Sequence, residues 1–130
     1  AEIVKLSLVA ISAVSLMVSG LGVMTVMSAS VTERTHEIGI KKAVGAKNAA
    51  ILGEFIAEGC LLSFYGAILG LLAGQGITWI ACQLLSLEFQ TDPTLLTAGA
   101  VMTVLLGTVF SAKPALRAAQ LDPVKALASE

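Results

Sequence analysis

The chain has 130 residues, of which 56% are hydrophobic and 13% charged, with a formal net charge of −1 and a mean hydropathy of +0.89. Soluble domains carry about 25% charged residues, and a small domain leaves much of its surface in water. These proportions exclude a water-soluble fold and indicate that lipid is the solvent for most of the chain. No basic stripe with interleaved aromatic residues is present, so we expect no nucleic-acid partner.

The first apolar segment has no charge between residues 6 and 29. About 20 apolar residues suffice to cross a bilayer, so residues 1–30 are predicted to hold a transmembrane helix at about 6–29. This run is too long for the apolar core of a signal peptide, which has about 7–15 residues. Ala1 is not an initiating methionine, so we expect a part of the protein upstream of this sequence.

Residues 31–53 form a charged segment between two apolar runs. Ser30 and Glu33 have the spacing of a capping box, in which a hydroxyl and a carboxylate satisfy the first backbone N–H groups of a helix. Gly45 suits the position just after the end of a helix, where a left-handed conformation is common. Together these signals predict a helix of about 14 residues that continues or bends off the first span.

The charges inside this helix have a favourable order. Glu37 and Lys41 are an i, i+4 pair in the better orientation, which stabilises a helix by a few tenths of a kcal/mol. Gly39 costs about 1 kcal/mol relative to alanine in a helix interior. We therefore expect that Gly39 permits the close approach of another surface.

The second apolar segment, residues 54–87, is longer than one span requires. We expect either a tilted helix or a span near residues 55–77 that breaks at residues 74–76 and continues as an interfacial extension. An external turn is predicted at residues 88–92. Gly66, Gly70 and Gly74 form overlapping GxxxG repeats, which predict close helix packing within the bundle or with a second copy.

The third apolar segment, residues 93–112, is uncharged and predicts another transmembrane helix. Residues 113–130 form a polar tail. In the tail, Asp122 and Pro123 favour a helix start, with Asp as the cap and Pro at the first position. The predicted fold class is therefore an all-α, multi-pass membrane protein with three transmembrane helices and a cytoplasmic coupling helix between the first two.

Lys and Arg residues predict the orientation. All of them except Lys5 lie in residues 31–53 or in the tail, and residues 88–92 have none. Because cytoplasmic loops are enriched in Lys and Arg, the charged segment and the C-terminus are predicted to be cytoplasmic, with the N-terminus outside.

Two separate motifs resemble one known family. Residues 33–46 read E-R-T-H-E-I-G-I-K-K-A-V-G-A, similar to the E-R-T-R-E-I-G-L-R-K-A-L/V-G-A pattern of FtsX/MacB-like ABC transporter permeases. Residues 114–127 are similar to the P-A-x-R-A-A-x-L-D-P-V-x-A-L tail of that family. His36 and Lys41 replace the usual arginines. The chain therefore resembles the C-terminal transmembrane half of such a type VII, mechanotransmission permease.

The resemblance implies a permease in the inner or plasma membrane that couples ATP hydrolysis by a separate subunit or domain to export or to lipoprotein or peptide handling outside. It implies no catalytic site, metal or cofactor in this chain, with ATP and Mg²⁺ in the partner ATPase. Other expected partners are a second permease copy, membrane lipid, and an upstream transmembrane helix with an extracytoplasmic domain. The alternative is a non-transporting scaffold that recruits a cytosolic protein, or a cell-division regulator of the FtsX type. The residues expected to bind the ATPase are Glu33, Arg34, Thr35, His36, Glu37, Ile38, Gly39, Ile40, Lys41, Lys42 and Gly45.

Overall fold

A computed structural model describes residues 1–128 as five helices and, within that range, no strand. The helices are α1 (Glu2–Glu33), α2 (Thr35–Ala43), α3 (Asn48–Leu85), α4 (Pro93–Ala119) and α5 (Pro123–Ala128). By length and composition, α1, α3 and α4 could each cross a membrane, as predicted. The all-α class with three such helices is thereby confirmed.

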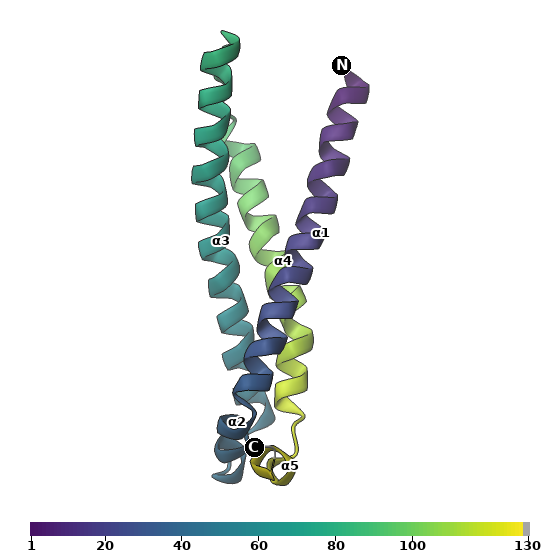
Figure 1. Cartoon of the computed structure of the whole chain (residues 1–130), viewed down its shortest axis with the longest axis vertical. Coiled ribbons are helices and arrows are strands. Elements are labelled where there is room, and N and C mark those ends of the chain that lie inside the picture. The colour runs from purple at the N-terminus through teal and green to yellow at the C-terminus, as the bar shows by residue number, and fades with distance from the viewer. Residues whose placement is uncertain (129–130) are drawn as a thin grey trace.

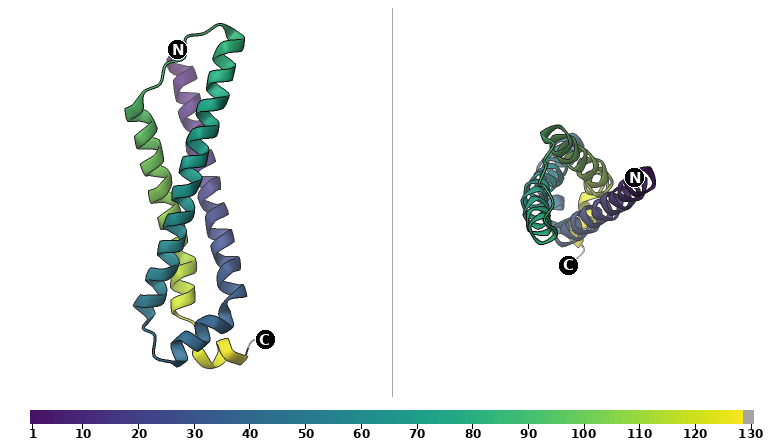
Figure 2. Two further views of the ribbon diagram at one scale, coloured as in Figure 1. Left: turned by 90° about the vertical axis from the view of Figure 1, so that its left-hand side faces the viewer. Right: turned by 90° about the horizontal axis from the view of Figure 1, so that it is seen from above.

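The three long helices meet at one end of the molecule and separate toward the other. Figures 1 and 2 show α3 and α4 running side by side, while α1 diverges from α3 toward the N-terminus. The short helices α2 and α5 lie together at the opposite end. Buried apolar side chains gather there as well, and their cluster contains Met27, Val31, Ile38, Ile51, Phe55, Ala115 and Ala118.

Many hydroxyl groups within the long helices donate to the backbone of their own helix. Ser7, Ser12 and Ser19 on α1 each donate to the carbonyl four residues earlier, at 2.8 Å. An unpaired polar group is costly in hydrocarbon. These bonds explain how an apolar helix of this length accommodates serine without a partner from another element.

Two reciprocal contacts hold α3 against α4. Gly59 lies against the side chain of Ser111, and Gly107 lies against the side chain of Ser63. Because the two helices are antiparallel, one Gly-x-x-x-Ser sequence on α3 meets a second one on α4. Small residues let backbones approach closely where lipid supplies no hydrophobic driving force. These four residues therefore determine the separation of the two helices.

The contact between α1 and α4 also depends on a glycine. Gly20 lies directly against the ring of Phe110, so a Cβ atom at this position would collide with the ring. By contrast, a Cβ at Gly66, Gly70 or Gly74 would meet no described atom within 4 Å. The predicted glycine face on α3 is therefore not used for packing among residues 1–128.

Two local expectations were wrong. First, of the two alternatives for the second segment, the break at residues 74–76 is wrong, because α3 runs without interruption from Asn48 to Leu85. Its 38 residues extend about 57 Å, against a hydrocarbon core of about 30 Å. Gly74 and Gly76 lack side chains, but their backbone groups can still form the hydrogen bonds of a helix. The helix therefore continues through both residues.

Second, Ser30 does not cap a new helix. α1 continues through Ser30 to Glu33, and α2 has nine residues instead of about 14. The N–H groups that a capping box would satisfy are already bonded within the continuing helix, so the hydroxyl of Ser30 has no capping role.

Candidate functional site

The chain turns sharply between α1 and α2 at the elbow, which we define as residues Glu33 to Thr35. The N–H of Arg34 donates to Ser30 O at 3.0 Å, and the N–H of Ile38 donates to Arg34 O at 3.0 Å. Arg34 therefore ends one helix and begins the next without a loop. This geometry turns its side chain toward α3.

At its other end, α2 stops at a glycine, as predicted. Gly45 has φ = +100°, and its N–H donates to Lys42 O at 3.1 Å, while the N–H of Ala46 donates to Lys41 O at 3.0 Å. This pair of bonds is the Schellman arrangement, which satisfies the last carbonyls of a helix. It turns the chain back toward α3.

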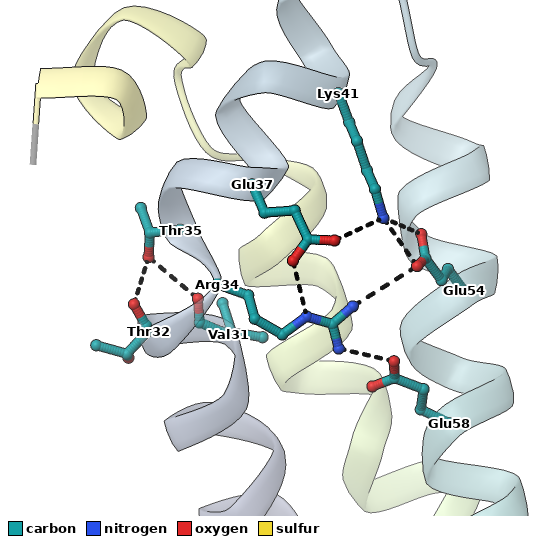
Figure 3. A network of polar contacts seen from close by, with 8 residues as sticks. All are labelled: Val31, Thr32, Arg34, Thr35, Glu37, Lys41, Glu54 and Glu58. Atoms are coloured by element: carbon teal, nitrogen blue, oxygen red, sulfur yellow. Dashed lines mark hydrogen bonds and ion pairs between the residues drawn. The ribbon is translucent and has the colours of Figure 1, made fainter.

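Arg34 is the centre of an ionic network between the elbow and α3 (Figure 3). Its Nη1 donates to Glu58 Oε1 at 2.7 Å, and its Nη2 lies 3.6 Å from Glu54 Oε1. Its Nε lies 3.6 Å from Glu37 Oε2, and its guanidinium carbon lies 5.1 Å from the centre of the Phe55 ring. The hydrogen bond with Glu58 raises the pKa of Arg34, with smaller contributions from the other carboxylates. Arg34 is thus held on α3 by both charge and an aromatic face.

Lys41 closes the same network, one helical turn after Glu37 on α2. Its Nζ donates to both carboxylate oxygens of Glu54, at 2.9 and 3.2 Å, and lies 3.6 Å from Glu37 Oε1. The last distance confirms the i, i+4 pair predicted between Glu37 and Lys41. The hydrogen bond with Glu54 raises the pKa of Lys41. Two cations from the elbow and α2 thus share carboxylates supplied by α2 and α3.

The opposite side of α2 is fastened to α4 and α5. Lys42 Nζ donates to the carbonyl oxygen of Ala119, the last residue of α4, and at 2.7 Å to that of Leu121, which follows the helix. A cation at a helix C-terminus is favoured by the helix dipole. A Cβ atom at Gly39 would lie 2.8 Å from the Cβ of Ala126, so α5 packs directly on this glycine. The close approach expected at Gly39 is made by this chain's own tail.

The tail helix begins as the sequence predicts. The N–H of Val124 donates to Asp122 Oδ1 at 3.0 Å, and the N–H of Ala126 donates to Asp122 O at 2.8 Å. Asp122 is therefore the cap, and Pro123 is the first residue of α5. Leu127 lies near Gly39, whereas Val124 is exposed.

The eleven residues expected to bind a partner fall into two groups. Ile38 and Gly39 are buried, and Arg34, Lys41 and Lys42 make the internal contacts just described. Thr35 is partly buried, and its hydroxyl donates to Val31 O and Thr32 O. The remaining residues are exposed: Glu33, His36, Glu37, Ile40 and Gly45.

The residues of α3 that receive these cations were not predicted to pair with them. From the sequence, the second span is expected to begin near Glu54, where carboxylates at a membrane interface are favoured by the helix start. In the structure α3 begins earlier, at Asn48. Their spacing of four residues places both on one face of α3, opposite the cations of the preceding segment. That spacing was the available signal for the network.

Residues 9–123 match the model of the FtsX-like permease C-terminal family. The chain is 42% identical over 124 residues to the macrolide export ATP-binding/permease protein MacB of Nitrobacter winogradskyi, covering 95% of this chain and 19% of that protein. It is 45% identical over 125 residues to MacB of Acinetobacter baylyi, covering 93% of this chain and 18% of that protein. An uncharacterized ABC transporter permease of Bacillus subtilis, YvrN, is 42% identical over 120 residues, which cover 92% of this chain and 29% of YvrN.

The chain thus spans less than a third of the length of these curated relatives. The match nevertheless includes most of α1, all of α2, α3 and α4, and the start of the tail. It agrees with the resemblance seen in the two sequence motifs. The chain therefore belongs to the FtsX-like permease C-terminal family of ABC transporter permeases.

Proposed function

We propose that this chain is the part of an ABC permease that receives motion from an ATPase subunit or domain and passes it to the transmembrane helices. Two relatives carry the name macrolide export ATP-binding/permease protein. ATP and Mg²⁺ then belong to the ATPase, and the permease part has no catalytic site of its own. The work done outside the membrane is export or the handling of lipoproteins or peptides.

The observation that carries this proposal is the two-sided character of α2. Its inner side is fastened to α3 by Arg34 and Lys41, and to α4 and α5 by Lys42 and Gly39. A displacement of α2 would therefore be shared by all three long helices. A helix that only anchored lipid would not require such extensive internal attachment.

The outer side of α2 supplies the surface for the ATPase. Ile40 is 47% exposed and Val44 is 81% exposed, and they lie four residues apart on one face. His36 extends the same face toward the elbow. An apolar pair on a helix face is the usual anchor of a helix bound in a groove. We therefore narrow the expected interface to this stripe and assign the basic residues to internal attachment.

The charge distribution supports a cytoplasmic location for α2 and α5. Lys and Arg residues other than Lys5 lie between residues 34 and 47 or between 113 and 125. Under the positive-inside rule this end faces the cytoplasm, where ATP is available, and the N-terminus of α1 lies outside.

A second permease copy is proposed for the open glycine face of α3. Gly66, Gly70 and Gly74 have no described atom near their Cβ positions. Small-xxx-small faces of this kind favour close helix pairing in membranes. Two copies would present two α2 helices to a pair of ATPase domains.

The test of the proposed function compares Ile40→Asp with Val124→Asp in the complete permease with its ATPase. Val124 is a matched control, because it is an exposed apolar residue at the same end but on α5. We expect Ile40→Asp to lower retention of the ATPase and the ATPase rate stimulated by the permease, with thermal stability unchanged. Equal losses for both variants, or unchanged coupling in Ile40→Asp, would refute an α2 interface. Retention of a partner without any ATP dependence would favour the scaffold function instead.

A further inference from the structure

A hollow separate from the ionic network lies between the elbow, the end of α4 and α5. Its volume is about 430 Å³, and its polar walls are Thr32, Thr35, Arg117 and Lys125. Val31 and Ala126, which are both buried, form part of its apolar lining. We propose that this hollow binds the head group of an anionic phospholipid.

The charge of the hollow is unbalanced. Arg117 and Lys125 are exposed, and neither forms an ion pair with a carboxylate among residues 1–128. No acidic residue lines the hollow, although Asp122 lies between the two cations in sequence. Figure 3 shows Thr32 and Thr35 on the side of the elbow away from Glu54 and Glu58. The carboxylates of α3 therefore neutralise Arg34 and Lys41, while the cations of the hollow are left for a ligand.

The threonine hydroxyls favour a particular head group. Thr35 Oγ1 donates to Val31 O at 3.0 Å and to Thr32 O at 2.9 Å, while Thr32 Oγ1 donates to Ser28 O at 3.0 Å. With their protons engaged, both oxygens are available as acceptors. A phosphate between Arg117 and Lys125 would supply the negative charge, and a hydroxylated head group would supply donors to the threonines. Phosphatidylglycerol has both features.

The hollow lies at the depth that lipid head groups occupy. Arg117 is five residues beyond the apolar segment predicted to end at Ala112, and Thr32 is three residues beyond the apolar segment predicted to end at Ala29. At 1.5 Å per residue these offsets are about 7.5 and about 4.5 Å. Basic pockets between transmembrane helices on the cytoplasmic side recognise anionic head groups. A lipid held here would join the elbow to the tail, and the inference does not depend on ATPase coupling.

The test counts lipids bound to the purified protein by native mass spectrometry, with phosphatidylglycerol and phosphatidylcholine titrated in detergent. We expect tighter binding of phosphatidylglycerol. Arg117→Gln and Lys125→Gln are each expected to lower its affinity about fivefold, the effect of one cation near a lipid surface. Circular dichroism verifies that the variants are folded.

Two controls remove the same charge outside the hollow. Lys113→Gln lies one helical turn before Arg117 on α4, and Lys47→Gln lies at the start of α3; neither residue lines the hollow. Changes below twofold in both controls support a defined site. A loss in the controls equal to that in Arg117→Gln would show general charge attraction and overturn the proposal.

Two further outcomes would also overturn it. Displacement of phosphatidylglycerol by an equal concentration of glycerol phosphate would identify a site for a soluble anion instead of a lipid. Unchanged lipid binding in Arg117→Gln and Lys125→Gln, together with loss of the ATPase, would identify a protein contact.

Discussion

Arg34 and Glu58 join the elbow to α3 through a contact of 2.7 Å between Nη1 and Oε1. Both side chains are partly exposed, so solvent screens part of the interaction. The contact nevertheless connects the elbow, where the chain changes direction, to the longest helix of the bundle. It is the relationship on which the coupling proposal depends most.

Reversing Arg34 tests this relationship. We expect Arg34→Glu to lower the free energy of unfolding by about 1–2 kcal/mol, because a charge-assisted hydrogen bond is lost in a partly screened setting. Thermal unfolding in detergent can be followed by the reaction of a thiol dye with the free cysteines Cys60 and Cys82. The double variant Arg34→Glu with Glu58→Arg should recover part of the loss, because the exchanged pair can form again while the new carboxylate still faces Glu37 and Glu54. If Arg34 contacts the ATPase instead, the second substitution will not restore coupling.

Replacing Gly39 tests the packing of the tail. In Gly39→Ala the new Cβ would lie 2.8 Å from Ala126, so α5 must shift. Overpacking costs about 1–3 kcal/mol, whereas alanine in place of glycine gains about 1 kcal/mol in a helix. We expect a net destabilisation of up to about 2 kcal/mol, measured by the same dye reaction. Gly53→Ala on α3 has no atom within 4 Å and should be neutral or stabilising.

Exchanging volume between α3 and α4 tests the reciprocal Gly-x-x-x-Ser contact. We expect Gly107→Ala to destabilise the bundle by about 1–3 kcal/mol, because its Cβ would collide with Ser63. Adding Ser63→Gly removes the colliding side chain and should restore much of the stability. Gly70→Ala serves as the control, since its Cβ meets no described neighbour. Equal effects of Gly107→Ala and Gly70→Ala would contradict the packing.

Removing the ammonium of Lys42 tests the attachment of α2 to α4. Lys42→Met leaves the carbonyls of Ala119 and Leu121 without this donor. We expect a loss of about 1–2 kcal/mol, in the range measured for hydrogen bonds to charged groups and partly screened here. Lys47→Met removes an exposed charge near α2 and should change stability by less than about 0.5 kcal/mol. Faster amide exchange in α5 should accompany the loss in Lys42→Met.

Raising the pH should release Lys41. Its pKa is raised in the folded state by Glu54, so its contribution is complete below the unfolded pKa of about 10.4 and is lost as pH rises through the folded pKa. Wild type should therefore be more stable than Lys41→Met at pH 8, and the two should converge as the pH rises through the raised folded-state pKa of Lys41. Melting followed by circular dichroism measures the difference. A constant difference across this range would exclude an ionic origin.

Local signals in the sequence predicted the ends of helices well. Gly45 ends α2 and Asp122 caps α5, because both effects depend on backbone geometry within a few residues. The three apolar runs likewise predict α1, α3 and α4, because lipid requires continuous hydropathy. The predicted helix start at Ser30 was wrong because α1 continues through this residue, and a continuing helix needs no cap.

Contacts between helices were harder to predict from the sequence than the ends of helices. Whether Arg34 faces Glu58 or a partner depends on the angle of the elbow, which no short motif encodes. The Gly66, Gly70 and Gly74 repeat was conspicuous, yet the contacts used within the chain are at Gly59 and Gly107. Their Gly-x-x-x-Ser pattern is equally local, but its meaning appears only when both copies are placed opposite each other.

The divergence of α1 has a consequence for how this sequence can drift over evolution. From Glu2 to Ser15 every side chain is exposed, so within this chain the requirement at these positions is hydropathy alone. One apolar residue can replace another there with little cost in packing. At Gly20, by contrast, the ring of Phe110 admits no side chain. The N-terminal half of α1 therefore tolerates exchange of one apolar residue for another. At Gly20, in the middle of the same helix, even one added methyl group would be selected against.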